Sequence, residues 1–299
     1  MKKLIFLFFI SSQIYSQKVQ FRGQLLDENT NEAIAYANIS FLKTNLGISS
    51  QVNGVFNLEI DEQLLQETVH ISCLNYKDTI VFAKQLQHKN LFLQPINIVL
   101  NEVVLLKRIE KIVVLGEVKK KISGVHTSGM RMIAKYFPKD KRSECCIYLE
   151  TLEIYFAKKL GHRKKSKFRI RVFDTDKKTG LPKNDILNTS LALEIKDGQK
   201  KVTIDISRYN LEMPENGLFI AFEKLFIPYN QYKLNVVETK SEVYYSPLIG
   251  FTKYNKMEVG SNLYLYTKGV WKLSQVSKID EMRKYAPAIS LTLSNQTNL

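Results

Sequence analysis

Alternating apolar and polar residues, broken by turn-forming clusters, dominate the first sixty residues of the chain. The run at residues 19–25 ends at the turn-prone residues 27–31, and a second run occupies residues 35–39. A third run, residues 56–60, follows Asn53-Gly54. A period of two is typical of half-buried strands, and Asn-Gly favours two-residue hairpins. The sequence therefore predicts a small antiparallel β-domain, with Asn53-Gly54 in a hairpin and the apolar side of the third run facing the core.

The same pattern returns from residue 147 onward, and no helical period is sustained beyond two turns. Strand-like runs occupy residues 147–156, 168–172, 202–206, 218–222, 263–266, 270–273 and 289–293. Such spacing predicts a larger sandwich or jelly-roll-like domain of roughly eight to ten strands. One short helix is predicted at residues 128–137, because Met130, Ile133, Ala134 and Phe137 recur at helical spacing and Pro138 follows.

Four motifs support a family resemblance for the N-terminal strands. They are Ala37-Asn38-Ile39, the segment from Gly47 to Asn53-Gly54-Val55-Phe56, Ile71-Ser72-Cys73-Leu74-Asn75-Tyr76, and Leu100-Asn101-Glu102-Val103-Val104. These motifs resemble the carboxypeptidase-like regulatory domain, a transthyretin-like β-sandwich found at the front of exported proteins of Bacteroidetes-type bacteria. Asn75 stands where that family has glycine, and asparagine also tolerates a left-handed turn position. The later strands resemble the uncharacterised C-terminal β-sandwich domain that follows this domain in many such proteins. The expected fold class is all-β, a transthyretin-like sandwich followed by a jelly-roll-like sandwich.

Residues 1–16 have the order of a secretory signal peptide. Lys2-Lys3 precede an apolar run at residues 4–10, and small residues near Ser16 predict cleavage before Gln17. No later apolar run approaches the roughly 18 residues that a transmembrane helix needs. We therefore expect an exported protein of the periplasm or cell surface, with a regulatory-like domain at 17–106, a connector at 107–126 and the C-terminal domain at 127–299.

The net charge of +15 is concentrated in the second half of the chain, where residues 127–299 hold thirty Lys and Arg against eighteen Asp and Glu. The densest basic run contains Arg163, Lys164, Lys165, Lys167, Arg169 and Arg171. If the intervening apolar residues face the core, the last three basic residues project from the opposite sheet face. This candidate patch suits an anionic glycan or lipid head group, whereas nucleic acid is not expected in this compartment. The alternative is a solvated face that discourages edge-to-edge aggregation.

Other chemistry-bearing residues have structural interpretations beside functional ones. Asp174 and Asp176 are spaced like calcium ligands, but Lys177 and Lys178 interrupt them and the loop is typical of a hairpin. Tyrosines and the only tryptophan, Trp271, crowd the last third, where they can stack on sugars or simply pack in strands. The three cysteines, Cys73, Cys145 and Cys146, are interpreted as small buried residues, and a disulfide from Cys73 to one of the others stays open.

No catalytic set is predicted from the sequence. A zinc carboxypeptidase needs His-x-x-Glu, and none of His70, His88, His126 or His162 has a glutamate three residues later. Serine-hydrolase, P-loop and dinucleotide fingerprints are also missing from the sequence. No catalytic residue, metal or cofactor is therefore predicted. We expect a non-enzymatic interaction or scaffolding protein of the cell envelope; the alternative is a binding protein for an anionic glycan or lipid head group, through the basic sheet face.

Overall fold

The computed structural model describes residues 17–87, 89–96, 111–118, 123–124, 132–157, 165–237, 240–253, 263–274 and 285–295. Every regular element in these residues is a β-strand or a short 3-10 helix, which confirms the all-β fold class. None of the helical turns in this part of the chain has the length or apolarity to cross a bilayer. The predicted signal peptide and half of the predicted connector (residues 107–110, 119–122 and 125–126) lie outside the described residues.

Two sheets form the N-terminal part, which we define as residues 17–96. One sheet has the order β4–β1–β7, with β1 at Lys18–Asp27, β4 at Val55–Asp61 and β7 at Asn90–Leu93. The other has the order β3–β2–β5–β6, with β2 at Asn38–Phe41, β3 at Gly47–Ser49, β5 at Thr68–Ser72 and β6 at Thr79–Phe82. Two 3-10 helices, η1 (Glu62–Gln66) and η2 (Ala83–Leu86), complete this part. Phe21 and Phe56 of the first sheet share one core with Ile39 and Ile71 of the second, as a sandwich requires.

Strand pairing in the N-terminal part differs from the predicted hairpin. Gly54 has the expected positive φ, +74°. However, its turn joins β3 of one sheet to β4 of the other, and β4 pairs with β1. This crossing places Phe56 and Ile60 in the core, as predicted, with Leu58 packed at its margin. The sheet is also not wholly antiparallel, because β1 pairs in parallel with β7.

The C-terminal part, residues 111–295, contains sixteen strands in the described residues, more than the roughly eight to ten predicted, because several are short edge strands. Its largest sheet has the order β13–β12–β16–β10–β20–β21, with β14 also paired to β12. A second sheet has the order β15–β11–β23–β8, a third β22–β19–β9, and β17 pairs with β18. The strands are β8 (Ile112–Leu115), β9 (Ser123–Gly124), β10 (Met132–Phe137), β11 (Tyr148–Tyr155), β12 (Ser166–Thr175), β13 (Pro182–Asp185), β14 (Leu191–Ile195), β15 (Lys201–Asp205), β16 (Leu218–Lys224), β17 (Gln231–Val237), β18 (Lys240–Tyr245), β19 (Gly250–Lys253), β20 (Tyr264–Thr267), β21 (Val270–Leu273), β22 (Tyr285–Pro287) and β23 (Ile289–Ser294), with 3-10 helices η3 (Ser207–Tyr209) and η4 (Pro228–Asn230).

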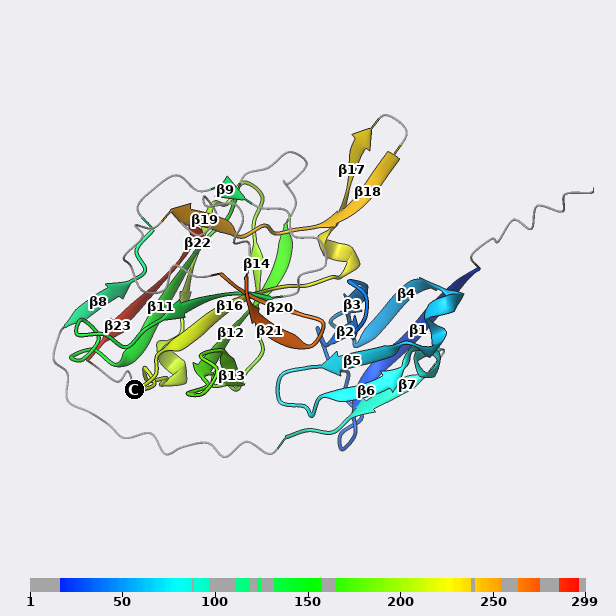
Figure 1. The fold of residues 1–299 in the computed structure, drawn as a ribbon, viewed down its shortest axis with the longest axis horizontal. Coiled ribbons are helices and arrows are strands. Elements are labelled where there is room, and N and C mark those ends of the chain that lie inside the picture. Colours follow the sequence, from blue (N-terminus) through cyan, green and yellow to red (C-terminus); the bar gives the residue numbers. More distant parts are fainter. Residues whose placement is uncertain are drawn as a thin grey trace, which may run out of the picture.

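The main core of the C-terminal part lies between its two largest sheets. Ile170 of β12 and Phe222 of β16 contribute from one sheet, and Leu152 of β11 and Leu291 of β23 from the other. Figure 1 shows this larger body at one end of the molecule and the N-terminal sheets at the other, with the β20–β21 hairpin reaching between them. Lys268, at the tip of that hairpin, donates to the carbonyl of Lys43 (3.2 Å).

The prediction of a helix at residues 128–137 is wrong at Met132–Phe137, which form strand β10. The rest of the predicted helix, residues 128–131, lies outside the described residues. Ile133 and Phe137 of this central strand face the main core, whereas Met132 and Ala134 face a second apolar cluster on the other side of the sheet. A strand buried on both faces carries a nearly continuous apolar run, and such a run does not distinguish a strand from a helix by period.

Candidate functional site at the junction of the two parts

Strand β12 has the two faces that its alternation predicts. Phe168, Ile170 and Val172 are completely buried in the main core. Lys167, Arg169 and Arg171 share the opposite face, as predicted. That face is turned toward the N-terminal part. The two-residue period therefore correctly grouped these side chains but did not reveal what covers them.

Arg169 and Glu223 form a buried ion pair on this face. They are directly opposite each other in the β12–β16 register. Arg169 Nε donates to Glu223 Oε2 (2.6 Å) and Nη2 donates to Oε1 (3.0 Å), and neither side chain is exposed. Two parallel N–H···O bonds are the strongest geometry for this pair of groups. The guanidinium of Arg169 is thereby neutralised inside the protein.

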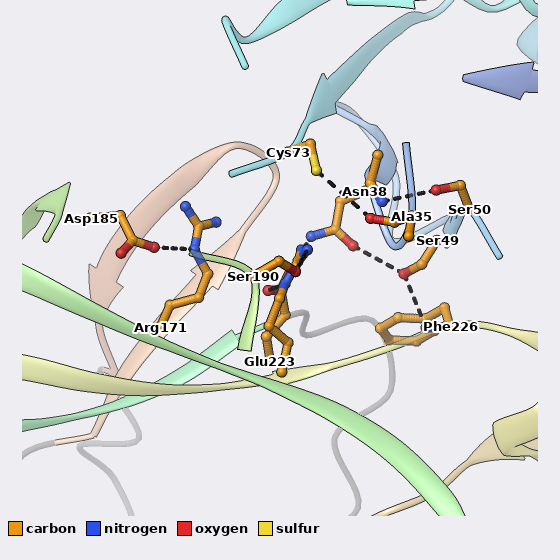
Figure 2. A network of polar contacts seen from close by, with 12 residues as sticks. Ala35, Asn38, Ser49, Ser50, Cys73, Arg171, Asp185, Ser190, Glu223 and Phe226 are labelled. Atoms are coloured by element: carbon orange, nitrogen blue, oxygen red, sulfur yellow. Dashed lines mark hydrogen bonds and ion pairs between the residues drawn. The ribbon is translucent and has the colours of Figure 1, made fainter. Parts of the chain in front are cut away.

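Asn38 connects the N-terminal part to this ion pair. It lies on β2, is almost fully buried, and donates from its amide to Glu223 Oε1. Its Oδ1 accepts a hydrogen bond from the Ser49 hydroxyl (3.0 Å), and that hydroxyl accepts one from the Phe226 N–H (3.1 Å). The Ser49 N–H in turn donates to the Phe226 carbonyl (3.2 Å). Figure 2 shows these contacts passing from the N-terminal strands to β16 and the residues after it.

Arg171 has a second internal carboxylate. Its Nε donates to Asp185 Oδ2 of β13 (2.6 Å), and both side chains are largely buried. The Asp185 Oδ1 atom accepts the Leu187 N–H (3.0 Å). Two of the three basic residues that alternate on β12 are therefore committed to carboxylates of the same chain.

The expectation that Arg169 presents its charge to an outside anion is wrong, because this side chain is buried and paired with Glu223. Lys167 is partly buried at the junction, where its Nζ lies 3.3 Å from the Tyr36 hydroxyl and 5.6 Å from the ring centre of Tyr229. Lys165 is exposed. Arg163 and Lys164, the other two members of the predicted patch, lie outside the described residues.

Burial and neighbouring charges compete at the junction, and the pKa values of its two buried acids shift in opposite directions. Burial alone would raise the pKa of the Glu223 carboxyl, but the charge and hydrogen bonds of Arg169, with Arg171 and Asn38, hold that pKa below its ordinary value. For Asp185, burial prevails over Arg171 and raises the pKa.

Cys73 lies in the same region, and burial raises the pKa of its thiol. Cys73 is not part of a disulfide, so the alternative pairing with Cys145 or Cys146 is not formed in this structure.

The paired aspartates of the β12–β13 turn have separate protein partners. Asp176 Oδ1 accepts the N–H groups of Lys178 and Thr179 (2.8 and 2.9 Å), as in an ordinary Asx turn. Asp174 accepts from the backbone and side chain of Asn184 (2.7 and 2.9 Å). The described residues contain no group of three or more acidic, cysteine or histidine side chains placed to hold a metal ion. A shallow hollow of about 460 Å³ lies beside this turn, and lysines 177, 178 and 183 line it.

Several of the late aromatic residues pack against one another on the junction side of the large sheet. The ring centres of Phe173 and Trp271 are 5.5 Å apart, and those of Phe219 and Tyr264 are 4.8 Å apart. Both pairs pack edge to face. Tyr266 also contacts Trp271. These rings stabilise the β20–β21 hairpin against the sheet, which supports their structural interpretation.

Sequence reasoning did not assign Asn38, Ser49 or Glu223 to a site, although Asn38 lies in one of the motifs that carry the family resemblance. Their one signal is polar character inside strands: Asn38 in a completely buried strand, and Glu223 at the end of the apolar run of β16. Lys224, the next residue, was also missed. This residue is about nine-tenths buried. Its ammonium group has no hydrogen-bond or ion-pair partner within the described part of the chain, and burial lowers its pKa to about 8.

The fold and the junction together define an all-β chain in which a small N-terminal sandwich is bonded to a larger β-rich part. Residues 21–105 match the CarboxypepD_reg-like domain family, which confirms the resemblance of the N-terminal motifs; a further β-rich part follows. Asn75 has the left-handed conformation expected there, with a φ of 69°. No curated protein sequence matches the chain.

Two solved structures show distant similarity. One contains the cysteine protease and lectin-like domains of Cwp84, a surface-layer-associated protein of Clostridium difficile, with 9% identity and a TM-score of 0.33 over 56% of this chain and 33% of that one. The chain thus spans a third of that structure. The other is a putative carbohydrate binding protein from Bacteroides uniformis, with 13% identity and a TM-score of 0.18 over 78% of this chain and 98% of that one.

Proposed function

We propose that this chain is a non-enzymatic interaction or scaffolding protein of the cell envelope, in which the CarboxypepD_reg-like part and the larger β-rich part act as one rigid unit. The observation that supports this proposal is the buried connection from Asn38 through Glu223 to Arg169. These charges have partners within the chain and are closed to solvent, so they suit a fixed geometry better than bond-making chemistry.

A rigid junction matters for binding because it fixes the relative positions of surfaces on both parts. When a partner contacts both parts, this chain then loses less conformational entropy on binding than two parts joined by a flexible linker would lose. Further bonds between the parts support this arrangement: Asn75 donates to the Asn188 carbonyl (3.1 Å), and Lys268 donates to the Lys43 carbonyl (3.2 Å).

Chemical cross-linking in cells of the native host tests this proposal. We expect a partner to be captured by residues of both parts of the wild-type protein, and Asn38→Ala to weaken that capture. Asn57→Ala is the matched control, because Asn57 is exposed on β4 and bonds only within its own sheet through Gln20 (3.1 Å). A partner held as firmly by the Asn38→Ala protein as by wild type contradicts the rigid unit, and turnover of a bound envelope component contradicts the non-enzymatic function.

The alternative function, binding of an anionic glycan or lipid head group, is favoured by one local arrangement. The Lys167 ammonium lies over the rings of Tyr36 (5.9 Å) and Tyr229 (5.6 Å), which combines a cation with aromatic surface at the junction. Calorimetric titration with an acidic glycan separates the two functions. Saturable heat that Lys167→Gln abolishes and Lys178→Gln retains supports the alternative, since Lys178 is exposed on the β12–β13 turn, at the opposite end of β12 from Lys167.

Export is part of the proposal and has its own test. We expect mass spectrometry of the protein from its native host to find Gln17 at the N-terminus, because the charged, apolar and small residues of positions 1–16 are ordered as in a signal peptide. Bulk protein that retains Met1 would contradict the envelope location.

A further inference from the structure

The loop between β10 and β11 ends in two neighbouring cysteines that are held in a well-defined turn. Asp140 accepts the backbone N–H of Arg142 (2.9 Å) and two bonds from its guanidinium (3.0 and 2.6 Å). The Ser143 hydroxyl also bonds to the backbone of Asp140 (2.8 Å). Side-chain to backbone bonds of this kind stabilise tight turns. These bonds therefore fix the backbone from which the side chains of the two following cysteines project.

The two sulfur atoms lie together but in different environments. Cys145 Sγ is 3.0 Å from Cys146 Sγ. Cys145 is exposed, whereas Cys146 is completely buried and belongs to the main core of the C-terminal part. An outside reagent therefore reaches Cys145 first, with Cys146 directly behind it.

We propose that Cys145 and Cys146 are a reversible oxidation site, at which a small disulfide oxidises the two neighbouring thiols to a disulfide. In the first step the Cys145 thiolate attacks the reagent, RSSR, forms a mixed disulfide and releases one RSH after protonation. The Cys146 sulfur then attacks the Cys145 sulfur, its proton passes to the departing group, and the second RSH leaves. The protein loses two electrons and two protons, and the reagent gains both.

The order of the two steps follows from burial. Burial raises the pKa of the Cys146 thiol to about 11, and its contact with Cys145 adds to the shift, so at neutral pH this group is a poor first nucleophile. Because the exposed thiol reacts first, the buried thiol takes the resolving role.

A disulfide between neighbouring residues is easily reduced again. Consecutive Cα atoms are about 3.8 Å apart, below the usual 4.4–6.8 Å range of disulfides, so the ring is strained. Strained and exposed disulfides have higher reduction potentials and are the labile ones. The site therefore suits reversible chemistry better than permanent stabilisation.

Oxidation also changes how strand β8 is held. The Cys146 S–H donates to the carbonyl of Lys111 (3.5 Å), the residue directly before β8. Lys111 is also bonded through its own N–H to Asn295 Oδ1 (3.0 Å). A disulfide has no S–H to donate, so oxidation removes one of the bonds at the start of this edge strand.

Peptide mapping of the full-length protein tests the site directly. The purified protein is incubated with glutathione disulfide, remaining thiols are alkylated after unfolding, and the peptide with both cysteines is weighed. We expect this peptide to have lost two hydrogen atoms and to take no alkyl group, and Cys73 to be alkylated. Dithiothreitol should restore both alkylation sites. A stable glutathione adduct on Cys145 with a free Cys146, or a bond from either residue to Cys73 or to another chain, would overturn the proposal.

Two single variants and one dynamic measurement complete the test. Cys146→Ser should accumulate the glutathione adduct at Cys145, and Cys145→Ser should stay unmodified at Cys146, because only the exposed thiol starts the reaction. Hydrogen exchange at Ile112–Leu115 should be faster in the oxidised protein than in the reduced one. Equal exchange in the two states contradicts the effect on β8.

Discussion

Arg169 and Glu223 face each other across two neighbouring strands, and the amide of Asn38 reaches the same carboxylate from 185 residues away in the sequence. The ion pair belongs to the large sheet, whereas Asn38 belongs to the N-terminal part. One buried carboxylate therefore serves both the sheet and the junction, so changes to it should affect the whole molecule.

Glu223→Gln should destabilise the protein by about 3–5 kcal/mol, because it leaves the buried Arg169 guanidinium without an opposite charge. Chemical denaturation of the full-length protein measures the free energy of unfolding. Glu215→Gln is the matched control: its partner is Lys139, but the Glu215 side chain is 82% exposed, so the loss should stay below about 1 kcal/mol. Equal losses in the two variants would contradict the burial argument.

Replacing both charged partners should cost much less than replacing one. In the double variant Arg169→Met, Glu223→Leu no buried charge is left unpaired, and apolar side chains fill a similar volume. We expect its free energy of unfolding to lie closer to wild type than that of Glu223→Gln. Asn38 loses its acceptor in this variant, so a residual loss of about 1–3 kcal/mol is expected from its unsatisfied amide.

The stabilisation by Glu223 should disappear in acid. Its folded pKa is held below the ordinary value of 4.5, so the folded state binds this proton less readily than the unfolded state does. The stabilisation is complete above the unfolded pKa and decreases as the pH falls through the folded pKa. The difference in unfolding free energy between wild type and Glu223→Gln should be constant near neutrality and shrink below about pH 4.5. Asp185 is present in both proteins, but the charge of Glu223 contributes to raising the pKa of the Asp185 carboxyl, so this opposite shift cancels only in part. If the difference in unfolding free energy between the two proteins grew in acid, it would contradict the lowered pKa of Glu223.

Lys224→Met should stabilise the protein at pH 7, on the order of 1–3 kcal/mol, because it removes a charge from a buried position. Burial lowers the folded pKa from 10.5 to about 8, so between these values the folded state has lost a proton that the unfolded state keeps. Wild-type stability should therefore rise with pH across this range, and the advantage of methionine should shrink. Lys196→Met, at an exposed position, is the control for charge removal alone.

Gly54→Ala should destabilise more than Gly180→Ala, although both glycines have positive φ (+74° and +66°). A Cβ at Gly54 would lie 2.5 Å from the Leu25 carbonyl oxygen, whereas a Cβ at Gly180 meets nothing within 4 Å. The backbone conformation alone costs about 1–2 kcal/mol, which is the loss expected for Gly180→Ala. The clash adds to this at Gly54. Thermal unfolding compares the two variants, and equal melting temperatures would show that the turn at Gly54 relaxes freely.

The fold class and the local faces of strands were predictable from sequence because they depend on short-range patterns. The two-residue period of β12 placed Phe168 and Ile170 in the core and grouped Arg169 with Lys167 and Arg171. Turn chemistry likewise predicted positive φ at Gly54, and the family resemblance implied it at Asn75. Each of these inferences needs only neighbouring residues, whose backbone preferences are local.

Only the tertiary structure decided what covers each face. Residues 132–137 form a strand because apolar clusters lie on both its sides, and no local period records the second cluster. In the same way, alternation placed Arg169 away from the core but could not bring Asn38 and Glu223 to it. Those contacts depend on long-range packing of one part of the chain against another, and that packing turned Arg169, a member of the predicted outer patch, into one half of a buried ion pair.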